Sequence, residues 1–583
     1  MRSRLAGIFG VLLGLFPLAL LAASTPSTAD RLVGLWGNVT VFGPSPGGPL
    51  TIDGRRQPWR AAMGGTDVAV EHAGGQVSFE LPGDRGRFRG HLVDGRIEGF
   101  WIQPPGKSLS SAYATPMVLA AAQPQVWSGR VRPLPDQVSQ YLMFMRTVEG
   151  QLVAYLRNPE FNLGRGRRYD VAVHDRAVVL TDPQRKGWAL HGAFDPGSNR
   201  LDIDWQGIGT FAFTRRDRGH AAGYYASTPP AALDRYRVPV ADDDGWPTAS
   251  LRSVGMDEAP LERMIRAIEA SDVPQPGGPQ VHAVLVARHG KLVFEAYFHG
   301  YDRERTHDTR SAGKSFASLL VGMAIDHGAR LSPDTPVLSM FPQYTPRQVD
   351  ARKRAITVGE LMDMTSGLAC DDNDPDSPGN EDVMQGQHAE SDWYRYTLDL
   401  PMARAPGGDK AVYCSAGINL LGGVVRHATG RWLPELFREW IADPLQMHNY
   451  HINLMPDGDA YFAGGIQLRP RDLLKLGQLY LEGGEWNGRR LVDKAWVEAS
   501  VTPHANFGSN HDYGYAWHLH TFRVGDRAYR EYAAEGNGGQ FAMVVPELDL
   551  AVVVNAGNYG EFGTWYPLQN LVTDYVMPAI ADR

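Results

Sequence analysis

The sequence is poor in cysteine and lysine and has no excess of positive charge. Two cysteines cannot form a zinc cluster or staple a small fold, although they can form one bridge in an oxidising compartment. Arginine and lysine together number 57 against 65 aspartates and glutamates, so the net charge of -8 offers no basic face to a phosphate backbone. We therefore expect no nucleic-acid partner. Only eight of the basic residues are lysines, which makes a lysine inside a motif more informative.

Long apolar runs are confined to the N-terminus. Arg2 and Arg4 precede an apolar run that ends in small residues around Ala22, Ala23 and Ser24, which is the layout of a secretory signal peptide. Beyond residue 30, no uncharged stretch approaches the ~20 apolar residues that a spanning helix needs. We therefore expect a signal peptide at residues 1–24 and a periplasmic or secreted mature protein without a membrane span.

The chain is also too long for one ordinary core, and its first part has the pattern of an all-β domain. Short alternating segments separated by turn residues fill residues 31–225, which predicts a β barrel or sandwich. A weak internal repeat links Leu35-Trp36-Gly37 with Val126-Trp127-Ser128-Gly129. This repeat is consistent with two related β units. Residues 226–249, rich in Pro, Ala and Asp, are interpreted as a linker.

Residues 250–583 have a different pattern, with strands near both ends and helices between them. This arrangement predicts one α/β domain that is closed by its own termini. The expected elements are helices at Pro260–Ala270, Ser311–His327 and Trp565–Ala581, and hairpins at Val281–Phe298 and Gln540–Asn555.

The only Ser-x-x-Lys sequence in the chain lies at the start of the second of these helices. Spacing of three residues places Ser311 and Lys314 on one helical face, within reach of each other. A serine hydroxyl is a weak nucleophile until a base accepts its proton, and a nearby ammonium group stabilises that base in its anionic form. A capping serine followed by a solvated lysine is the structural alternative.

Two later elements could complete a catalytic site. Tyr413-Cys414-Ser415 precedes an apolar helix, and a tyrosine becomes a usable base when a cation stabilises its phenolate. Gly536-Asn537-Gly538-Gly539-Gln540 lies where a strand turns, and its glycines let backbone N–H groups approach a ligand as in an oxyanion hole. Each element taken alone is also compatible with a purely structural role.

In this order and spacing, the three elements resemble the class C β-lactamase, DD-peptidase and family VIII esterase group of serine hydrolases. The resemblance covers about residues 250–583 and includes Thr357–Leu368 and Leu473–Trp486. It implies a β-lactamase-like domain with an antiparallel sheet, flanking helices and a helical subdomain.

The resemblance also implies a role for each site residue. Ser311 would be the nucleophile, Lys314 its electrostatic and proton partner, and Tyr413 the general base. Ser415 would orient Lys314 or the leaving group. The backbone N–H groups of Ser311 and Asn537 would form the oxyanion hole.

The sequence departs from the β-lactamase pattern at the third element, which has no Lys-Thr-Gly or His-x-Gly. The cation and hydroxyl that hold a β-lactam carboxylate are therefore missing, and the short glycine-rich form resembles esterases and amide hydrolases. We expect an exported enzyme that cleaves a small-molecule ester or amide through an acyl-enzyme on Ser311. The alternatives are a β-lactamase or DD-peptidase, and a non-catalytic protein that binds cell-wall peptides. The oligomeric state and the natural substrate stay open.

No cofactor and no metal are expected. His518 and His520 alternate on a predicted strand with no third ligand evident, so we interpret them as structural or pocket-lining. The acidic segment Asp371–Glu390 lacks the glycine and closing glutamate of a calcium loop, and together with Phe507–His520 it is a candidate for lining the pocket.

The two cysteines lie beside the predicted site. If the resemblance holds, Cys370 and Cys414 are both at the rim of the same cleft, and export favours a bridge between them. Two separate buried thiols are the alternative.

Overall fold

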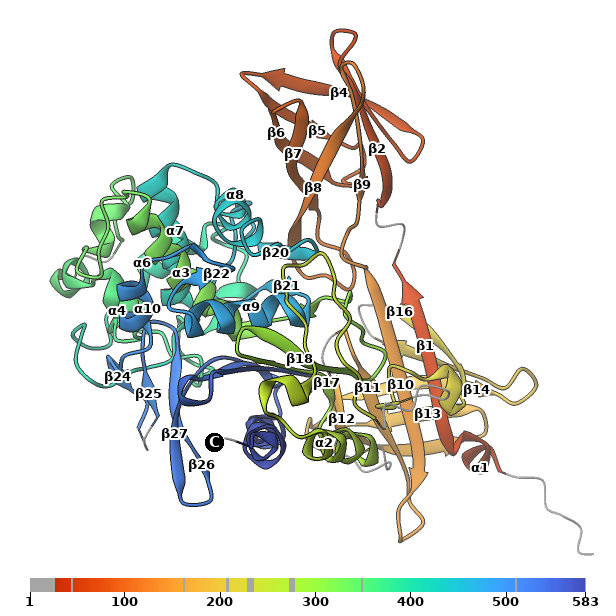
Figure 1. Cartoon of the computed structure of the whole chain (residues 1–583). Helices are drawn as coiled ribbons and strands as arrows, with labels where there is room; N and C mark the ends of the chain where they lie inside the picture. Colours follow the sequence, from red (N-terminus) through yellow and green to blue (C-terminus); the bar gives the residue numbers. More distant parts are fainter. Residues whose placement is uncertain are drawn as a thin grey trace, which may run out of the picture.

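The computed structural model of the chain describes residues 27–42, 46–160, 163–205, 209–227, 235–271, 278–347, 350–508 and 511–581. It contains two closed β barrels in the N-terminal part and a mixed domain of sheet and helices in the C-terminal part (Figure 1). The predicted all-β region, followed by a domain of sheet and helices, is confirmed. The predicted signal peptide at residues 1–24 lies outside the described residues.

The first barrel, called here the outer barrel, is closed by strands that hydrogen-bond in antiparallel pairs around an apolar interior. Trp36 and Phe194 meet edge to face inside it. Its strands are β1 (Gly34–Val41), β10 (Gln137–Arg146), β11 (Leu152–Asn158), β12 (Leu163–His174), β13 (Ala177–Thr181), β14 (Ala189–Asp195), β15 (Arg200–Trp205) and β16 (Gly209–Arg215). The short helix α1 (Thr28–Leu32) precedes β1.

The second barrel, called here the inserted barrel, lies in the chain between the first two strands of the outer barrel and projects upward in Figure 1. Trp59 and Trp127 stack in its interior. Its strands are β2 (Gly48–Asp53), β3 (Trp59–Met63), β4 (Thr66–Ala73), β5 (Gln76–Glu80), β6 (Arg87–Val93), β7 (Arg96–Gln103), β8 (Ala112–Gln123) and β9 (Val126–Val131).

The two barrels exchange the strands that carry the repeated tryptophans. If each repeated segment formed its own barrel, β1 would pair with β2 and β8 in the first barrel. In the second barrel, β9 would pair with β10 and β16. Instead, β9 pairs with β2 and β8, whereas β1 pairs with β10 and β16. Trp36 therefore lies in the core of the later unit and Trp127 in the core of the earlier one. The outer barrel therefore combines β1 with strands that follow the inserted barrel, whereas the strands β2–β9 of the inserted barrel are consecutive in the chain.

The C-terminal domain is built on an eight-stranded antiparallel sheet. Its strands, in spatial order, are β18 (Lys291–Tyr297), β17 (Val281–Arg288), β29 (Leu550–Ala556), β28 (Gln540–Val545), β27 (Arg527–Gly536), β26 (His518–Val524), β25 (Asp512–Tyr513) and β24 (Ala505–Asn506). Because β17 pairs with β29, strands from both ends of the domain lie side by side, as the sequence pattern predicts.

Helices cover both faces of this sheet and form a separate helical region (Figure 1). The α-helices are α2 (Glu258–Ala270), α3 (Lys314–Asp326), α4 (Val358–Met362), α5 (Glu381–Gly386), α6 (Trp393–Asp399), α7 (Ser415–Thr429), α8 (Leu433–Leu436), α9 (Pro470–Leu481), α10 (Lys494–Ser500) and α11 (Phe562–Trp565). None of the helices in the described part of the chain is long and apolar enough to cross a membrane.

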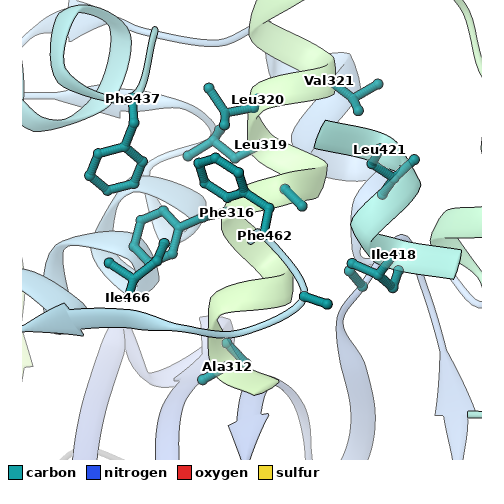
Figure 2. Close-up of a cluster of buried hydrophobic side chains, with 14 of the residues drawn as sticks. Ala312, Phe316, Leu319, Leu320, Val321, Ile418, Leu421, Phe437, Phe462 and Ile466 are labelled. Atoms are coloured by element: carbon teal, nitrogen blue, oxygen red, sulfur yellow. The ribbon is translucent and has the colours of Figure 1, made fainter. Parts of the chain in front are cut away.

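Helix α3 lies at the centre of the largest apolar core. Phe316, Leu319 and Leu320 are buried in a cluster that includes Phe437, from the segment after α8, and Phe462, from the loop between β20 and β21 (Figure 2). All of α3 up to Ala324 is buried. This burial fixes the position of the residues at its N-terminal end, where Ser311 and Lys314 lie.

The helix expected at Trp565–Ala581 is not continuous. The chain instead forms α11, a 3-10 turn at Tyr566–Gln569, a π-helical turn at Val572–Val576 and a second 3-10 turn at Met577–Ala579. Pro567 and Pro578 each lack the backbone N–H of a continuous helix and clash with the preceding turn. The apolar face that suggested a helix is still buried against the sheet.

The barrels are joined to the C-terminal domain by paired strands and by a buried polar cluster. β8 pairs with β20 (Tyr450–Leu454), which pairs with β21 (Ile466–Leu468), and β21 pairs with β19 (His307–Asp308). From β11, the buried guanidinium of Arg157 donates hydrogen bonds to His282 and His299 of the C-terminal domain, each at 2.9 Å.

The described parts of the predicted linker, 226–249, are packed rather than extended. Trp246 is buried and donates a hydrogen bond to the carbonyl of Arg471, and Asp244 forms an ion pair with the same arginine at 3.2 Å. The boundaries of the domains stay a prediction.

Candidate active site

The structure brings Ser311 and Lys314 together at the base of α3. Ser311 lies in the 3-10 turn Arg310–Gly313 that runs directly into α3, and its side chain is partly exposed. Lys314 is 1% exposed, and its Nζ donates hydrogen bonds to Ser311 Oγ at 2.8 Å and to the carbonyl of Ala463 at 2.6 Å. A lysine held in this way is not the solvated surface lysine of the structural alternative.

Tyr413 lies on the other side of the serine and completes a three-residue cluster. Its side chain is hydrogen-bonded to Ser311, and Lys314 Nζ is 5.0 Å from the centroid of its ring. Burial raises the pKa of Tyr413 far above its ordinary value, and the carboxylates of Asp372 and Glu381 raise it further. Burial also lowers the pKa of Lys314, against the opposing effect of the same two carboxylates. Both effects favour the uncharged phenol and the uncharged amine.

Ser415 is oriented towards an acidic pair rather than towards Lys314. It is the first residue of α7, its backbone N–H donates to Asp372 Oδ2 at 2.8 Å, and its hydroxyl donates to Glu381 Oε2 at 3.4 Å. Burial and the nearby charge of Glu381 raise the pKa of Asp372 to about 6. The acidic segment after Cys370 thus contributes to the wall of the site.

The predicted bridge between Cys370 and Cys414 is confirmed, with a Cα–Cα distance of 5.3 Å. It joins the acidic segment to the residue that follows Tyr413. The backbone N–H of Asp372 also donates to the carbonyl of Tyr413 at 2.9 Å. The backbone that carries the tyrosine is therefore held in place by a covalent bond and a hydrogen bond.

The residue before the serine has a strained backbone. Arg310 has φ of 48°, a region that residues with a side chain rarely adopt. Asp308 forms an ion pair with its guanidinium at 2.9 Å, and the ring of Tyr559 lies 4.8 Å from it. Tyr113 from β8 of the inserted barrel is half-buried and lies close enough to the same ion pair for both charges to affect its pKa. Strain held by surrounding contacts is typical of functional sites, and here a barrel strand contributes to those contacts.

Asn537 is placed at an exposed turn, where its side chain accepts a hydrogen bond from the backbone of Gly560 at 2.9 Å. Its neighbour Gly536 is the residue that meets the serine turn. A side chain added to Gly536 would lie 2.4 Å from the carbonyl oxygen of Thr309 and 3.1 Å from the backbone nitrogen of Ala312. The end of β27 therefore touches the turn that carries Ser311, and only glycine permits this approach.

Sequence reasoning missed a cluster of histidines and glutamates next to Tyr413. The ring of His518 lies 6.5 Å from that of Tyr413, and His511 provides the third histidine that the sequence pattern did not reveal. Burial lowers the pKa of His518 to about 3. Burial also acts to lower the pKa of His520. The hydrogen bond and the charge of Glu535 act in the opposite direction and raise the pKa of His520 to about 9. Two histidines spaced by two on a strand were the available signal.

The part of the chain that carries this site matches a known protein family. The Beta-lactamase family model matches residues 277–561. This match includes the serine turn, α3, the tyrosine segment and the end of β27. The C-terminal part of the chain is therefore a Beta-lactamase family domain, a hydrolase family with esterase and amide-hydrolase members.

Two curated relatives align with part of the chain. A 6-aminohexanoate-dimer hydrolase of Paenarthrobacter ureafaciens is 27% identical over 228 residues, which is 37% of this chain and 56% of that protein. Esterase EstB of Burkholderia gladioli is 28% identical over 179 residues, 28% of this chain and 45% of that protein. The chain thus spans about half the length of the curated relatives it matches.

Solved structures with a similar arrangement include a D-stereospecific amidohydrolase from Streptomyces sp., with a TM-score of 0.41 and 18% identity over 53% of this chain and 98% of that one. Another is a penicillin-binding protein homolog from Caulobacter crescentus, with a TM-score of 0.41 and 16% identity over 52% of this chain and 92% of that one.

Proposed function

We propose that the protein is a serine hydrolase that cleaves a small-molecule ester or amide through an acyl-enzyme on Ser311. The observation that carries the proposal is the buried side chain of Lys314, whose Nζ lies 2.8 Å from Ser311 Oγ while the same serine is hydrogen-bonded to Tyr413. A serine, a base and a second proton donor in mutual contact are the minimum for acyl transfer. The two curated relatives, named as a 6-aminohexanoate-dimer hydrolase and an esterase, support hydrolysis of this kind of bond.

In the proposed mechanism, Ser311 Oγ attacks the carbonyl carbon while its proton passes to the uncharged amine of Lys314. Burial favours that uncharged form, whereas the raised pKa of Tyr413 favours a phenol that donates its proton to the leaving group. This division differs from the one implied by the family resemblance, in which Tyr413 is the base. The backbone N–H groups of Ser311 and of the end of β27 would stabilise the oxyanion. Proton transfer from Lys314 to Tyr413 then restores both groups. Water attacks the acyl-enzyme, its proton passes to Lys314 and from there to Ser311 Oγ, and the acid product leaves.

The surroundings of the site favour a substrate without a carboxylate at this position. Asp372 and Glu381 lie close enough to affect the pKa of Lys314, and their negative charge would repel an anionic group. The Lys-Thr-Gly that would hold a β-lactam carboxylate is missing from the sequence. Both features favour neutral or cationic esters and amides over β-lactams.

A fluorophosphonate probe tests the nucleophile directly. We expect stoichiometric labelling of the wild type and none of Ser311→Ala, while Ser253→Ala, a change in an exposed turn, labels normally. An unlabelled wild type would favour the non-catalytic binding protein. Substrate class is tested with p-nitrophenyl esters of graded chain length, short linear amides and a chromogenic cephalosporin. Turnover of the cephalosporin above all others would favour a β-lactamase.

We also propose that the protein is exported. The Cys370–Cys414 disulfide supports this location, because such bonds persist in the periplasm or outside the cell and are rare in the cytosol. The basic and apolar N-terminal sequence provides the corresponding signal. Intact-mass analysis of protein from the periplasmic fraction should show loss of about 24 residues, and a full-length cytosolic protein would contradict the proposal.

A further inference from the structure

Three histidines converge on one edge of the sheet from two separate segments. His518 and His520 are two residues apart on β26 and therefore share a face of the sheet. His511 reaches them from the loop between β24 and β25. One ring nitrogen from each of the three lies within 4.8 Å of the others. Within the described part of the chain, this is the one group of three or more such side chains with this convergence.

The spacing of the nitrogens matches that of a tetrahedral metal site. A zinc–nitrogen bond is about 2.0–2.1 Å long, so two nitrogens on one ion are about 3.4 Å apart. His511 Nε2 and His518 Nδ1 lie 2.8 Å apart, and the upper limit for all three pairs is 4.8 Å. These distances lie on either side of the ideal spacing, so small side-chain rotations are sufficient to accommodate an ion.

Two buried carboxylates from β27 face the same cluster. Glu535 Oε1 lies 2.7 Å from His520 Nε2, and its Oε2 lies 3.9 Å from His518 Nδ1. Glu531 is the cross-strand partner of His520, so its side chain is on the same face, and it is 1% exposed. Neither carboxylate oxygen of Glu531 has a hydrogen-bond partner among the residues that the structure describes.

These acidic side chains favour a bound cation. Glu535 is buried and bonds His520, and the carboxyl oxygens of Glu531, the cross-strand neighbour of His520, have no hydrogen-bond partner among the described residues. A divalent cation bound by the three imidazoles would interact favourably with both side chains. Glu535 would complete the coordination or orient a histidine ligand, as carboxylates beside metal-bound histidines commonly do.

The cluster is also accessible from solvent. His520 lines an open groove together with Asn506, Asp512 and Tyr566, whereas His518 is on the inner side next to Tyr413. An ion could therefore enter from the groove without opening the core, and once bound it would lie beside the proposed active site.

We propose that His511, His518 and His520, supported by Glu535, bind a divalent transition-metal ion, with zinc the best match to three imidazoles and one carboxylate. The proposal concerns binding and does not depend on the proposed hydrolase activity. Neutral imidazole nitrogens are preferred ligands of zinc, copper, nickel and cobalt, whereas calcium and magnesium prefer sets of oxygen ligands.

The test uses the full-length, untagged protein after dialysis against a chelator. Titration with Zn²⁺ in competition with a chromophoric chelator should give one equivalent bound, and Co²⁺ should produce the visible absorption of a four-coordinate ion. We expect His518→Ala and His520→Ala each to weaken Zn²⁺ binding about 100-fold or more, and Glu535→Gln about 10-fold. Glu535→Gln preserves side-chain shape and keeps the test informative if a histidine variant unfolds, which circular dichroism would reveal.

The matched control is His289→Ala, because His289 lies in an exposed hairpin turn and pairs only with Asp549 among the described residues. This variant should bind Zn²⁺ as the wild type does. The proposal is overturned if the wild type binds much less than one equivalent, or if folded His518→Ala and Glu535→Gln bind Zn²⁺ with unchanged affinity. A Co²⁺ spectrum typical of six-coordinate, water-like surroundings would also overturn it.

Discussion

The two barrels and the C-terminal domain bury different kinds of side chain. The cores of the barrels are apolar, and the buried guanidinium of Arg157 on β11 bonds histidines of the C-terminal domain. Most barrel strands pair with strands adjacent in sequence. The C-terminal domain instead buries Lys314, Glu531 and Glu535, which in isolation are unfavourable to bury. Its sheet pairs strands from the two ends of the domain. The C-terminal domain thus buries charged groups at a cost in stability, and one of them, Lys314, is part of the proposed active site.

The largest expected effect separates catalysis from stability. Ser311→Ala should reduce turnover at least ~10³-fold, and Tyr413→Phe nearly as much, because residues that act as one unit have non-additive effects. The free energy of unfolding of Ser311→Ala should stay close to that of the wild type, since the serine is partly exposed. Steady-state kinetics with the best p-nitrophenyl ester and urea unfolding measure the two quantities. Wild-type turnover by Ser311→Ala would exclude the mechanism.

Substitutions in the barrel cores should change the free energy of unfolding and leave turnover unchanged. Trp36→Ala should cost about 3–5 kcal/mol because it removes a fully buried indole from the core of the outer barrel. Hydrogen exchange should become faster in β10–β16, although Trp36 is close in sequence to β2. Trp127→Ala is the matched variant and should affect β2–β8 instead. Faster exchange confined to β2–β8 in Trp36→Ala would contradict the exchanged-strand arrangement.

Loss of the disulfide should lower both the stability of the C-terminal domain and the turnover. Replacing Cys370 and Cys414 together by serine opens a loop of 44 residues and should destabilise the domain by about 3–4 kcal/mol. Turnover should also fall, because the bridge restrains the backbone that carries Tyr413. Thermal unfolding and kinetics of the double variant, compared with the reduced wild type, measure both effects. Unchanged turnover would show that the hydrogen bond from Asp372 to the Tyr413 carbonyl is sufficient.

The smallest expected effect is a pH dependence of stability. The pKa of Asp372 is raised from 3.8 to about 6, so between these values the folded protein holds a proton that the unfolded chain has released. The stability from this carboxyl is complete below pH 3.8 and is lost as the pH rises through about 6. The free energy of unfolding of the wild type should therefore decrease relative to that of Asp372→Asn between pH 4 and 7.

Urea unfolding at a series of pH values measures this difference. The control variant is Asp376→Asn, which changes an exposed carboxylate of the same segment and should keep a constant offset from the wild type. If the difference in free energy of unfolding between Asp372→Asn and the wild type were also the same at every pH, it would contradict the raised pKa of Asp372.

Much of the local structure could be predicted from the sequence. The hairpin at β17 and β18, the helix α3 and the contact between Ser311 and Lys314 follow from side-chain periodicity and from a spacing of three residues. The break in the C-terminal helix was also visible, because Pro567 and Pro578 lie inside the apolar pattern that predicted a continuous helix.

The tertiary structure decided the features that join distant segments. Nothing in the local pattern of β1 or β9 indicates which barrel each strand completes, because both alternate in the same way and either register would bury a tryptophan. The convergence of His511 with His518 and His520 depends on a loop conformation. The burial of Glu531 beside them depends on the pairing of β26 with β27. Short-range spacing is encoded by neighbouring residues, whereas contacts between distant segments arise from strand register and core packing, which exist only when the whole chain has folded.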